Sequence, residues 1–235
     1  MAMNFVTVKG EDYHVSNYRL SINRVKLTEI SEINGLATLT NLQRLDLAHN
    51  QINEIKGLKK LTNLQMLDVS DNRIKEIKGL EQLTKLQILN LSNNRIKEIK
   101  GLETSTKLQE LHLYSNQIEE ITGLEQLSNL QVLNLSSNQI KEIQGLTQLP
   151  NLKILWLSNN QIEEITGLEQ LSNLQVLNLH VNKIKEISGV ESLSNLQCLF
   201  LRGNPIRDDE WDFVNIGFDN AQKVVSYCKE KMKKG

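Results

Sequence analysis

The chain has 235 residues, of which 27 are Lys or Arg and 28 are Asp or Glu, so its formal net charge is −1 at pH 7. A charge so close to zero, without a long block of one sign, excludes nucleic acid and anionic membrane as partners attracted by bulk charge. No apolar stretch approaches membrane-spanning length, and residues 1–15 lack the apolar run of a signal peptide. We therefore expect a soluble, cytoplasmic protein without membrane insertion.

An internal repeat organises most of the sequence. The stretch NQIEEITGLEQLSNLQVLNL occupies residues 116–135 and occurs again, unchanged, at residues 160–179. A break every 22 residues aligns nearly everything between Asn41 and Pro205. Repeats of roughly 20 to 50 residues are typical of solenoids, in which a unit that cannot bury its own apolar face stacks on its neighbours. The sequence therefore predicts one elongated domain.

Residues 1–18 are expected to form an N-terminal cap. FVTV and YHVS read as short strands and the intervening KGED as a turn, so the segment predicts a β-hairpin. A lid is needed here because a solenoid exposes its core at both ends. Residues 19–206 then form the repeat region, with a degenerate first unit, seven full units of 22 residues and a truncated last unit.

Each full unit changes its apolar spacing part of the way along. In the first full unit, which begins at Asn41 as position 1, Leu45 and Leu47 alternate with polar residues, as in a short strand with one buried face. Apolar residues then recur at every third position from Ile52 to Leu61, which predicts an irregular or 3₁₀ return segment instead of a long α-helix.

Two positions of the unit are constant. Position 10 is always Asn, whose side chain can both donate and accept hydrogen bonds to backbone groups of a bend, whereas an ionised Asp only accepts. Position 17 is always Gly, which suits a tight turn or a close approach of neighbouring coils. We interpret both rows as structural. The asparagine row is Asn50, Asn72, Asn94, Asn116, Asn138, Asn160, Asn182 and Asn204.

The pattern LxxLxLxxNxIxxIxGLxxLx, from about Leu20 to Ile206, resembles leucine-rich repeats of the 22-residue class. This Sds22-like class is named after a regulator of protein phosphatase 1 and also includes bacterial internalins. The resemblance implies an α/β solenoid: a curved, right-handed leucine-rich-repeat superhelix with a concave parallel β-sheet and short 3₁₀ or irregular convex segments. It also implies that the concave sheet binds other proteins.

Residues 207–235 are expected to form a C-terminal cap that contains an amphipathic helix. Asp219 or Asn220 is available as its N-cap, and lysines lie near its end. We expect the apolar stripe of this helix to cover the last unit, with the docking of a partner helix as the alternative. The stripe consists of Ala221, Val224, Val225, Cys228 and Met232.

Function is expected where the repeat changes on the concave face. If positions 5 and 7 point inward, positions 4, 6 and 8 point outward from the sheet. Positions 6 and 8 are mostly small and polar, but large residues replace them toward the C-terminal end, on strands that lie ~4.8 Å apart. Aromatic residues and Arg are enriched among those that dominate binding energy. We predict a partner-binding patch formed by Trp156, His180, Phe200 and Arg202, with Ile154 and Val176 beside them.

Two further groups complete the predicted concave binding face. In the middle of the sheet, His112 and Tyr114 also replace the small polar residues that are usual at positions 6 and 8. Asp46 and Asp68 belong to a mostly acidic N-terminal end. For Phe200, packing against the C-terminal cap is the alternative to a contact with a partner.

The sequence predicts no enzyme, no cofactor and no metal site. His112 and His180 stand about 14 Å apart at the usual strand spacing, too far to share a metal ion. The glycines recur with the repeat and do not cluster as in a phosphate-binding loop. Ser158 and His180 form the one adjacent Ser–His pair on the sheet, and no carboxylate is expected to orient that histidine.

The leading hypothesis is a non-catalytic, monomeric module that binds a protein on its concave sheet. The resemblance allows a phosphatase, a small GTPase or a cytoskeletal protein as the partner. The only cysteines, Cys198 and Cys228, are too few for disulfide-stapled caps and favour a reducing compartment. Two alternatives stay open: a bacterial surface adhesin of internalin type, and a structural or consensus-designed scaffold without an evolved partner.

Overall fold

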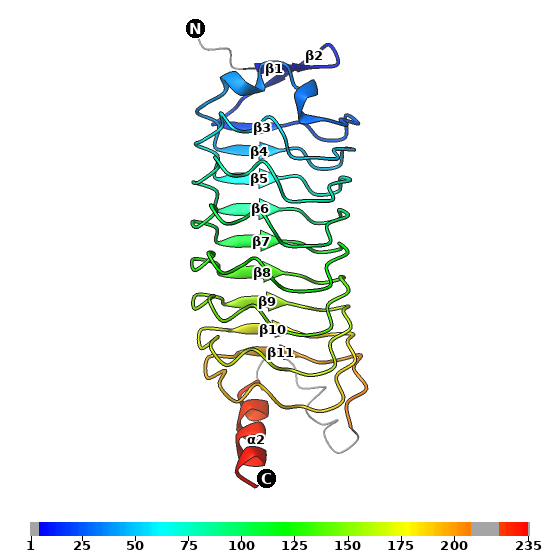
Figure 1. Cartoon of the computed structure of the whole chain (residues 1–235), viewed down its shortest axis with the longest axis vertical. Coiled ribbons are helices and arrows are strands. Elements are labelled where there is room, and N and C mark those ends of the chain that lie inside the picture. Colours follow the sequence, from blue (N-terminus) through cyan, green and yellow to red (C-terminus); the bar gives the residue numbers. More distant parts are fainter. Residues whose placement is uncertain (1–4, 208–220, 235) are drawn as a thin grey trace.

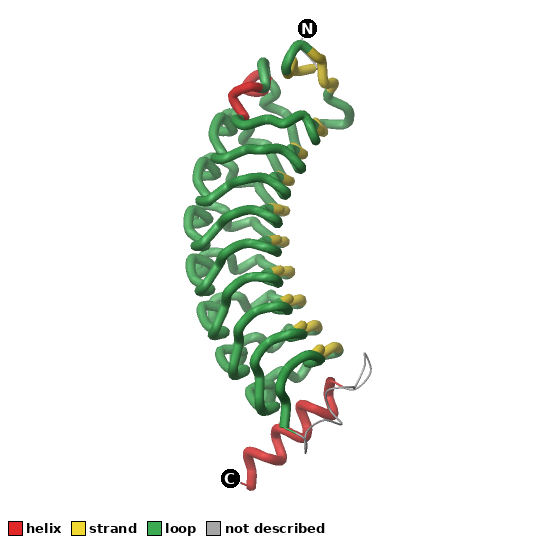
Figure 2. Tube along the Cα trace, turned by 90° about the vertical axis from the view of Figure 1, so that its right-hand side faces the viewer, coloured by secondary structure: helices red, strands yellow, loops and turns green. Residues whose placement is uncertain are grey.

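The computed structural model describes residues 5–207 and 221–234. Its body is a stack of coils, one per repeat, that forms a curved rod (Figures 1 and 2). Nine three-residue strands form one parallel sheet in chain order, and Figure 2 shows them on the concave side. The strands are β3 (Arg19–Ser21), β4 (Arg44–Asp46), β5 (Met66–Asp68), β6 (Ile88–Asn90), β7 (Glu110–His112), β8 (Val132–Asn134), β9 (Ile154–Trp156), β10 (Val176–Asn178) and β11 (Cys198–Phe200). The predicted solenoid with a concave parallel sheet is confirmed.

Neighbouring full units pair in register. Leu45 of β4 lies beside Leu67 of β5, which lies beside Leu89 of β6, so the partners are always 22 residues apart. Residues at the same unit position therefore form rows across the sheet. The central leucine of each strand is buried, whereas most flanking residues are half-buried. The alternation predicted from the sequence thus places the variable positions 4 and 6 on the concave surface.

The core is a continuous stack of leucines and isoleucines. Every described residue at positions 2, 5, 7, 12, 15, 18 and 21 of the units is buried, and all but one are apolar. The exception is Ser105, which takes the position that leucine occupies in the other full units, such as Leu83 and Leu127. Ser105 is 1% exposed, and its hydroxyl has no hydrogen-bond partner. The row of buried leucines is therefore interrupted in one coil by a smaller, polar side chain.

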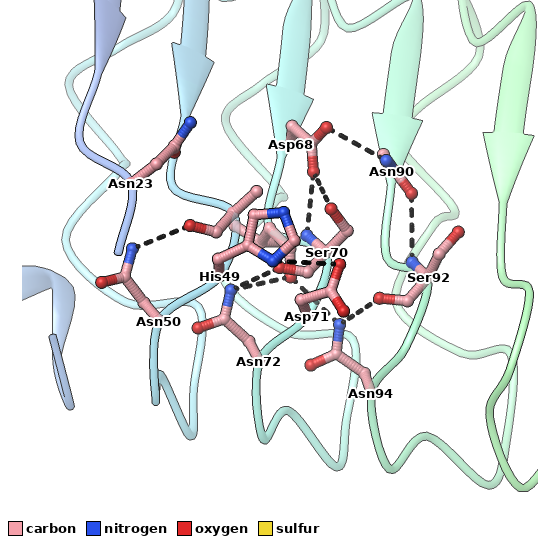
Figure 3. Close-up of polar contacts among 12 residues, drawn as sticks. Asn23, His49, Asn50, Asp68, Ser70, Asp71, Asn72, Asn90, Ser92 and Asn94 are labelled. Atoms are coloured by element: carbon pink, nitrogen blue, oxygen red, sulfur yellow. Dashed lines mark hydrogen bonds and ion pairs between the residues drawn. The ribbon is translucent and has the colours of Figure 1, made fainter. Parts of the chain in front are cut away.

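The asparagine row forms a ladder of hydrogen bonds along the stack (Figure 3). Asn72 shows the pattern: its Nδ2 donates to the carbonyls of Val69 and Ser70 in its own coil, at 3.0 and 2.9 Å, and of Leu47 in the preceding coil, at 3.1 Å. Its Oδ1 accepts a 2.9 Å hydrogen bond from the backbone N–H of Ile52. Each asparagine therefore joins two coils and satisfies backbone groups of the bend that follows the strand.

The glycine row permits the close stacking of the return segments. All eight of these glycines have φ between 71° and 91°, a backbone region that side chains disfavour. A Cβ atom at Gly145 would lie 2.1 Å from the carbonyl oxygen of Ile121 in the preceding coil. At Gly57, by contrast, the nearest atom to such a Cβ is 3.9 Å away. The positive φ of the turn favours glycine at all eight positions. From Gly79 to Gly189, a carbonyl oxygen of the preceding coil also leaves no room for a Cβ atom.

The N-terminal cap is the predicted hairpin, with a shorter turn than expected. Strands β1 (Phe5–Val8) and β2 (Glu11–His14) pair antiparallel through the two residues Lys9 and Gly10. Both have positive φ, 50° and 86°, as in a type I′ turn. The predicted four-residue turn KGED was therefore wrong in length, because Glu11 and Asp12 belong to β2. The degenerate first unit then forms β3 and the 3₁₀ helices η1 (Ile30–Glu32) and η2 (Leu36–Thr38).

The C-terminal helix α2 (Ala221–Lys234) lies at the other end of the stack (Figures 1 and 2). The four predicted stripe residues from Ala221 to Cys228 are buried, and Gln222 Nε2 donates to the carbonyls of Leu193 and Leu196 at 3.3 and 2.8 Å. Met232 was wrongly placed in the stripe. It is 69% exposed because it lies in the last turn of the helix, which projects past the coils in Figure 1. The proposed N-cap residues, Asp219 and Asn220, lie outside the described residues.

Among the residues that the structure describes, no helix is both long and apolar enough to span a membrane.

Candidate functional site

Strands β9, β10 and β11 bring the largest concave side chains together. Trp156 and Phe200 end β9 and β11, and both pair in register with Asn178 between them. Ile154 and Val176 lie side by side at position 4 of the same strands. These two side chains, Trp156 and Phe200 are all half-buried. We call the surface made by Ile154, Trp156, Val176, His180, Val181, Phe200 and Arg202 the C-terminal patch.

Position 6 has a structural role that the sequence analysis did not identify. Where it is Asn or Asp, its side-chain oxygen accepts a hydrogen bond from the backbone N–H of position 8 and so caps the end of the strand. These bonds are 2.9 to 3.1 Å long and start at Ala48, Ser70, Ser92, Ser136 and His180. Trp156 and Phe200 carry no side-chain oxygen that could accept it. Trp156 and Phe200 therefore replace a strand-capping group.

Position 8 follows the strand, and its small residues are shielded: Ala48, Ser70 and Ser136 are buried, and Ser92 and Ser158 are half-buried. The Ser70 hydroxyl donates to Asp68, a side chain of the concave row, at 2.6 Å. A large side chain at this position reaches solvent, as Tyr114 and Arg202 do. Small residues at position 8 therefore belong to the scaffold, and large ones contribute surface.

The ring of His180 is fixed in the C-terminal patch by two contacts. It lies against the ring of Phe200, with the centroids 5.3 Å apart and the planes inclined by 39°. Its Nδ1 is 3.1 Å from the backbone carbonyl oxygen of Arg202. A carbonyl only accepts, so this bond assigns the proton of the neutral ring to Nδ1 and leaves Nε2 as an acceptor.

Val181 belongs to the patch, and its backbone conformation is unusual for its residue type. It occupies position 9, where every described full unit has positive φ, and its own φ is 53°. The other residues there are His, Asp, Asn or Ser, whereas a β-branched residue is a true outlier in this conformation. Val181 is also 51% exposed. The sequence signal for this residue is a valine in a row of small or polar residues.

The mid-sheet group gains a member in the structure. His112 Nε2 lies 3.4 Å from Glu110 Oε2, two residues earlier on β7, and Tyr114 is 40% exposed. Glu110 takes position 4, where the neighbouring units have the apolar Ile88 and Val132. The predicted pair of His112 and Tyr114 therefore belongs to a polar group on β7 and the residues that follow it, whereas the C-terminal patch lies on β9, β10 and β11.

The predicted acidic residues at the N-terminal end make hydrogen bonds within the chain (Figure 3). The Asp68 carboxylate accepts from the backbone N–H and the hydroxyl of Ser70, at 2.9 and 2.6 Å, and from Asn90 Nδ2 at 3.0 Å. Asp46 accepts from the backbone of Ala48 and from the side chains of two residues of the first unit. Much of the hydrogen-bonding capacity of both carboxylates is thus used by the scaffold, and their contact with a partner stays a prediction.

No group of three or more His, Cys, Asp and Glu side chains in the described ranges is arranged to hold a metal ion. Cys228 is buried, with its thiol 3.5 Å from the carbonyl oxygen of Ile187, and Cys198 is half-buried on β11.

Comparison with known proteins agrees with this geometry. A family model described as leucine-rich repeats in two copies matches residues 40–82, 62–104, 84–126, 128–170 and 172–212. Among solved structures, internalin C2 of Listeria monocytogenes is 34% identical, with 81% of this chain and 74% of that chain covered and a TM-score of 0.57. No curated protein sequence matches the chain.

Two further solved structures share the architecture. A leucine-rich repeat protein of Leptospira interrogans is 30% identical, with a TM-score of 0.65, and the alignment covers 89% of this chain but 59% of that one. The functional domain of InlJ from Listeria monocytogenes is 22% identical over 80% of this chain and 49% of that chain, with a TM-score of 0.58, and shows the fold alone. Since the repeat model matches most of the chain, and internalin C2 is 34% identical across 74% of its own length, the chain belongs to the leucine-rich repeat family.

Proposed function

We propose that this chain is a non-catalytic module that binds another protein through the C-terminal patch. The observation that carries the proposal is that two patch residues depart from what the scaffold favours. Trp156 takes the place of a strand-capping oxygen, and Val181 adopts a backbone conformation that costs a β-branched residue of order 1–3 kcal/mol. Both add apolar surface on or beside the concave sheet, where apolar patches rimmed by polar groups mark interaction sites.

The comparisons support a bacterial, internalin-like module over the Sds22-like alternative. The 34% identity to internalin C2 extends over most of both chains, and the Leptospira protein is also bacterial. We therefore propose a surface adhesin of internalin type as the setting in which the patch works. Its partner would then be a protein of another cell.

The cytoplasmic setting stays a competing proposal. It rests on the cysteine content: Cys198 and Cys228 are too few for the disulfide-stapled caps of exported repeat proteins, which favours a reducing compartment. In that setting the partner would be a phosphatase, a small GTPase or a cytoskeletal protein of the same cell. The two settings differ in the pool of proteins that contains the partner, so one capture experiment can separate them.

The experiment compares the wild type with the double variant Trp156→Asn, Val181→Asn. Both changes restore residues that the repeat uses at the same positions elsewhere, such as Asn134 and Asn159, so the double variant is expected to fold. The matched control is Asp46→Asn, Asp68→Asn, which introduces the same residue type into position 6 at the other end of the sheet. Each protein is immobilised and exposed both to solubilised animal-cell surface proteins and to a lysate of the source organism.

We expect a protein from the cell-surface pool that binds the wild type and the control but not the double variant. Capture from the organism's own lysate with the same pattern would support the patch but reject the adhesin setting. Capture by the double variant that is lost in the control would move the site to the acidic N-terminal end. No specific capture from either pool would favour a scaffold without an evolved partner.

A further inference from the structure

The return segments of this solenoid differ in charge: those of the second and third full units have more cations than carboxylates, and those of the fourth and sixth have three glutamates and no cation. The segment NRIKEIKGLE occurs twice in succession, at residues 72–81 and 94–103. In the repeated stretches that begin at Asn116 and Asn160, the positions of its cations hold Gln, Glu and Thr. The near-zero net charge of the chain therefore conceals a basic stretch in the second and third full units, outside the concave sheet.

The basic stretch surrounds a hollow of about 580 Å³. Its lining contains five cations and two carboxylates, with Ile77 and Gln117 completing it. The carboxylates belong to Glu76 and Glu98. The cations are Lys75, Lys78, Arg95, Lys97 and Lys100.

Two of the five cations are neutralised within the chain. Lys78 forms an ion pair with Glu76, and Lys100 forms the equivalent pair with Glu98 one coil later. The hydrogen bond between the partners lowers the pKa of Glu76 and raises that of Lys78, so both groups are charged at neutral pH. Glu76 and Glu98, the two carboxylates of the hollow, therefore each have an ion-pair partner within the chain.

The other three cations have no ion-pair partner in the described part of the chain. They are Lys75, Arg95 and Lys97, and all three are exposed. Lys75 and Lys97 occupy the same position in adjacent coils, whose strands lie ~4.8 Å apart at the sheet and farther apart on the convex side. The coil stacking keeps the backbones of these two lysines on adjacent coils, so an anion bound between the coils would interact with both positive charges.

We propose that this hollow binds an acidic segment of a protein in an extended conformation. Carboxylates on alternate residues of such a segment recur at roughly 6.6–7 Å, which allows them to follow cations placed on successive coils. The guanidinium of Arg95 offers a planar fork that matches a carboxylate. The two fixed glutamates disfavour a uniformly charged polyanion such as a nucleic acid, whereas a peptide can place a neutral residue opposite them. This site is independent of the C-terminal patch.

The test uses a fluorescein-labelled peptide of five Glu-Ala repeats, titrated with the protein at low ionic strength and followed by fluorescence anisotropy. The test variant is Lys75→Glu, Lys97→Glu. The matched control is Lys141→Glu, Lys185→Glu, which changes the net charge equally and alters the same repeat position in other units. Circular dichroism checks that both variants are folded, as expected for exposed side chains.

We expect the test variant to bind the peptide about tenfold more weakly than the wild type, and the control about twofold more weakly at most. The Trp156→Asn, Val181→Asn variant should bind the peptide as the wild type does, because the concave site is separate. Equal loss in test variant and control would show that net charge alone attracts the peptide, and would overturn the proposal.

Two other outcomes would also overturn it. An oligothymidylate of the same charge that binds as tightly as the peptide, with the same sensitivity to Lys75→Glu, Lys97→Glu, would assign the hollow to nucleic acid. Sedimentation at the same ionic strength that shows a dimer of the wild type, lost in this variant, would assign the hollow to a second copy of the chain.

Discussion

The imidazole ring of His180 packs against the phenyl ring of Phe200, with 5.3 Å between their centroids. The first residue follows β10 and the second ends β11, so the contact joins neighbouring coils at the concave surface. The Nδ1 bond of His180 to the carbonyl oxygen of Arg202 fixes the ring further. A partner would therefore meet a surface whose side chains are already ordered, which lowers the entropy cost of binding.

The left-handed backbone of Val181 predicts that Val181→Asn stabilises the protein. Asn tolerates this conformation better than a β-branched residue does, and we expect the free energy of unfolding to rise by about 1 kcal/mol. Thermal unfolding monitored by circular dichroism measures the change. The matched control is Ser137→Val, at the equivalent position with φ 56°, which should lower stability by a similar amount. Equal stability of wild type and both variants would show that this backbone carries no strain.

The unsatisfied hydroxyl of Ser105 predicts that Ser105→Leu stabilises the stack. The change restores the leucine row and removes a buried polar group without a hydrogen-bond partner, so we expect a gain of about 2 kcal/mol in denaturant unfolding. The reciprocal change, Leu127→Ser in the next coil, should cost at least about 2 kcal/mol. A loss of stability in Ser105→Leu would show that the neighbouring side chains already fill the space.

The glycine row predicts a graded response to alanine. Gly145→Ala should cost about 3 kcal/mol, because the added methyl group would lie 2.1 Å from a backbone oxygen of the preceding coil, in addition to the strain of positive φ. Gly57→Ala has the same φ penalty but free space, so about 1 kcal/mol is expected. Chemical unfolding of the two variants side by side compares them. Equal costs would mean that turn conformation alone, and not coil stacking, requires glycine.

The asparagine ladder predicts that Asn138→Ala is among the most destabilising single changes on this face. It leaves the N–H of Ile118 without its bond and removes one of the two asparagine bonds to each of the carbonyls of Leu113 and Leu135, at a cost of about 3 kcal/mol. Asn134→Ala, four residues earlier, loses the bond to one backbone N–H and should cost about 1 kcal/mol. Unfolding in urea distinguishes the two. If the order were reversed, strand capping would matter more than the ladder.

Much of the fold was predictable because the repeat fixes each residue's surroundings. Once Leu45, Leu67 and Leu89 are recognised as equivalent, their burial and pairing follow from the alternation of a strand. The asparagine and glycine rows follow from hydrogen-bonding capacity and backbone freedom. Met232 was misplaced because helical spacing shows which face a residue is on, but not where the surface beneath it ends.

The features that sequence did not reveal depend on backbone angles and on contacts between side chains. Nothing in the alternation of strands shows that position 9 has positive φ, so the strain at Val181 stayed hidden. The capping bonds of position 6 require the chain to turn immediately after the strand, which a pattern of polar residues does not specify. The basic hollow likewise depends on which lysines pair with Glu76 and Glu98.

The central claim is that a protein partner contacts the C-terminal patch, and site-specific photocrosslinking tests it most directly. A photoreactive phenylalanine analogue would replace Trp156 in one protein and Asp46, at the same unit position, in another. After irradiation with the captured partner pool, we predict a covalent adduct from position 156 and none from position 46. An adduct from position 46 alone, or equal yields from both positions, would contradict the account.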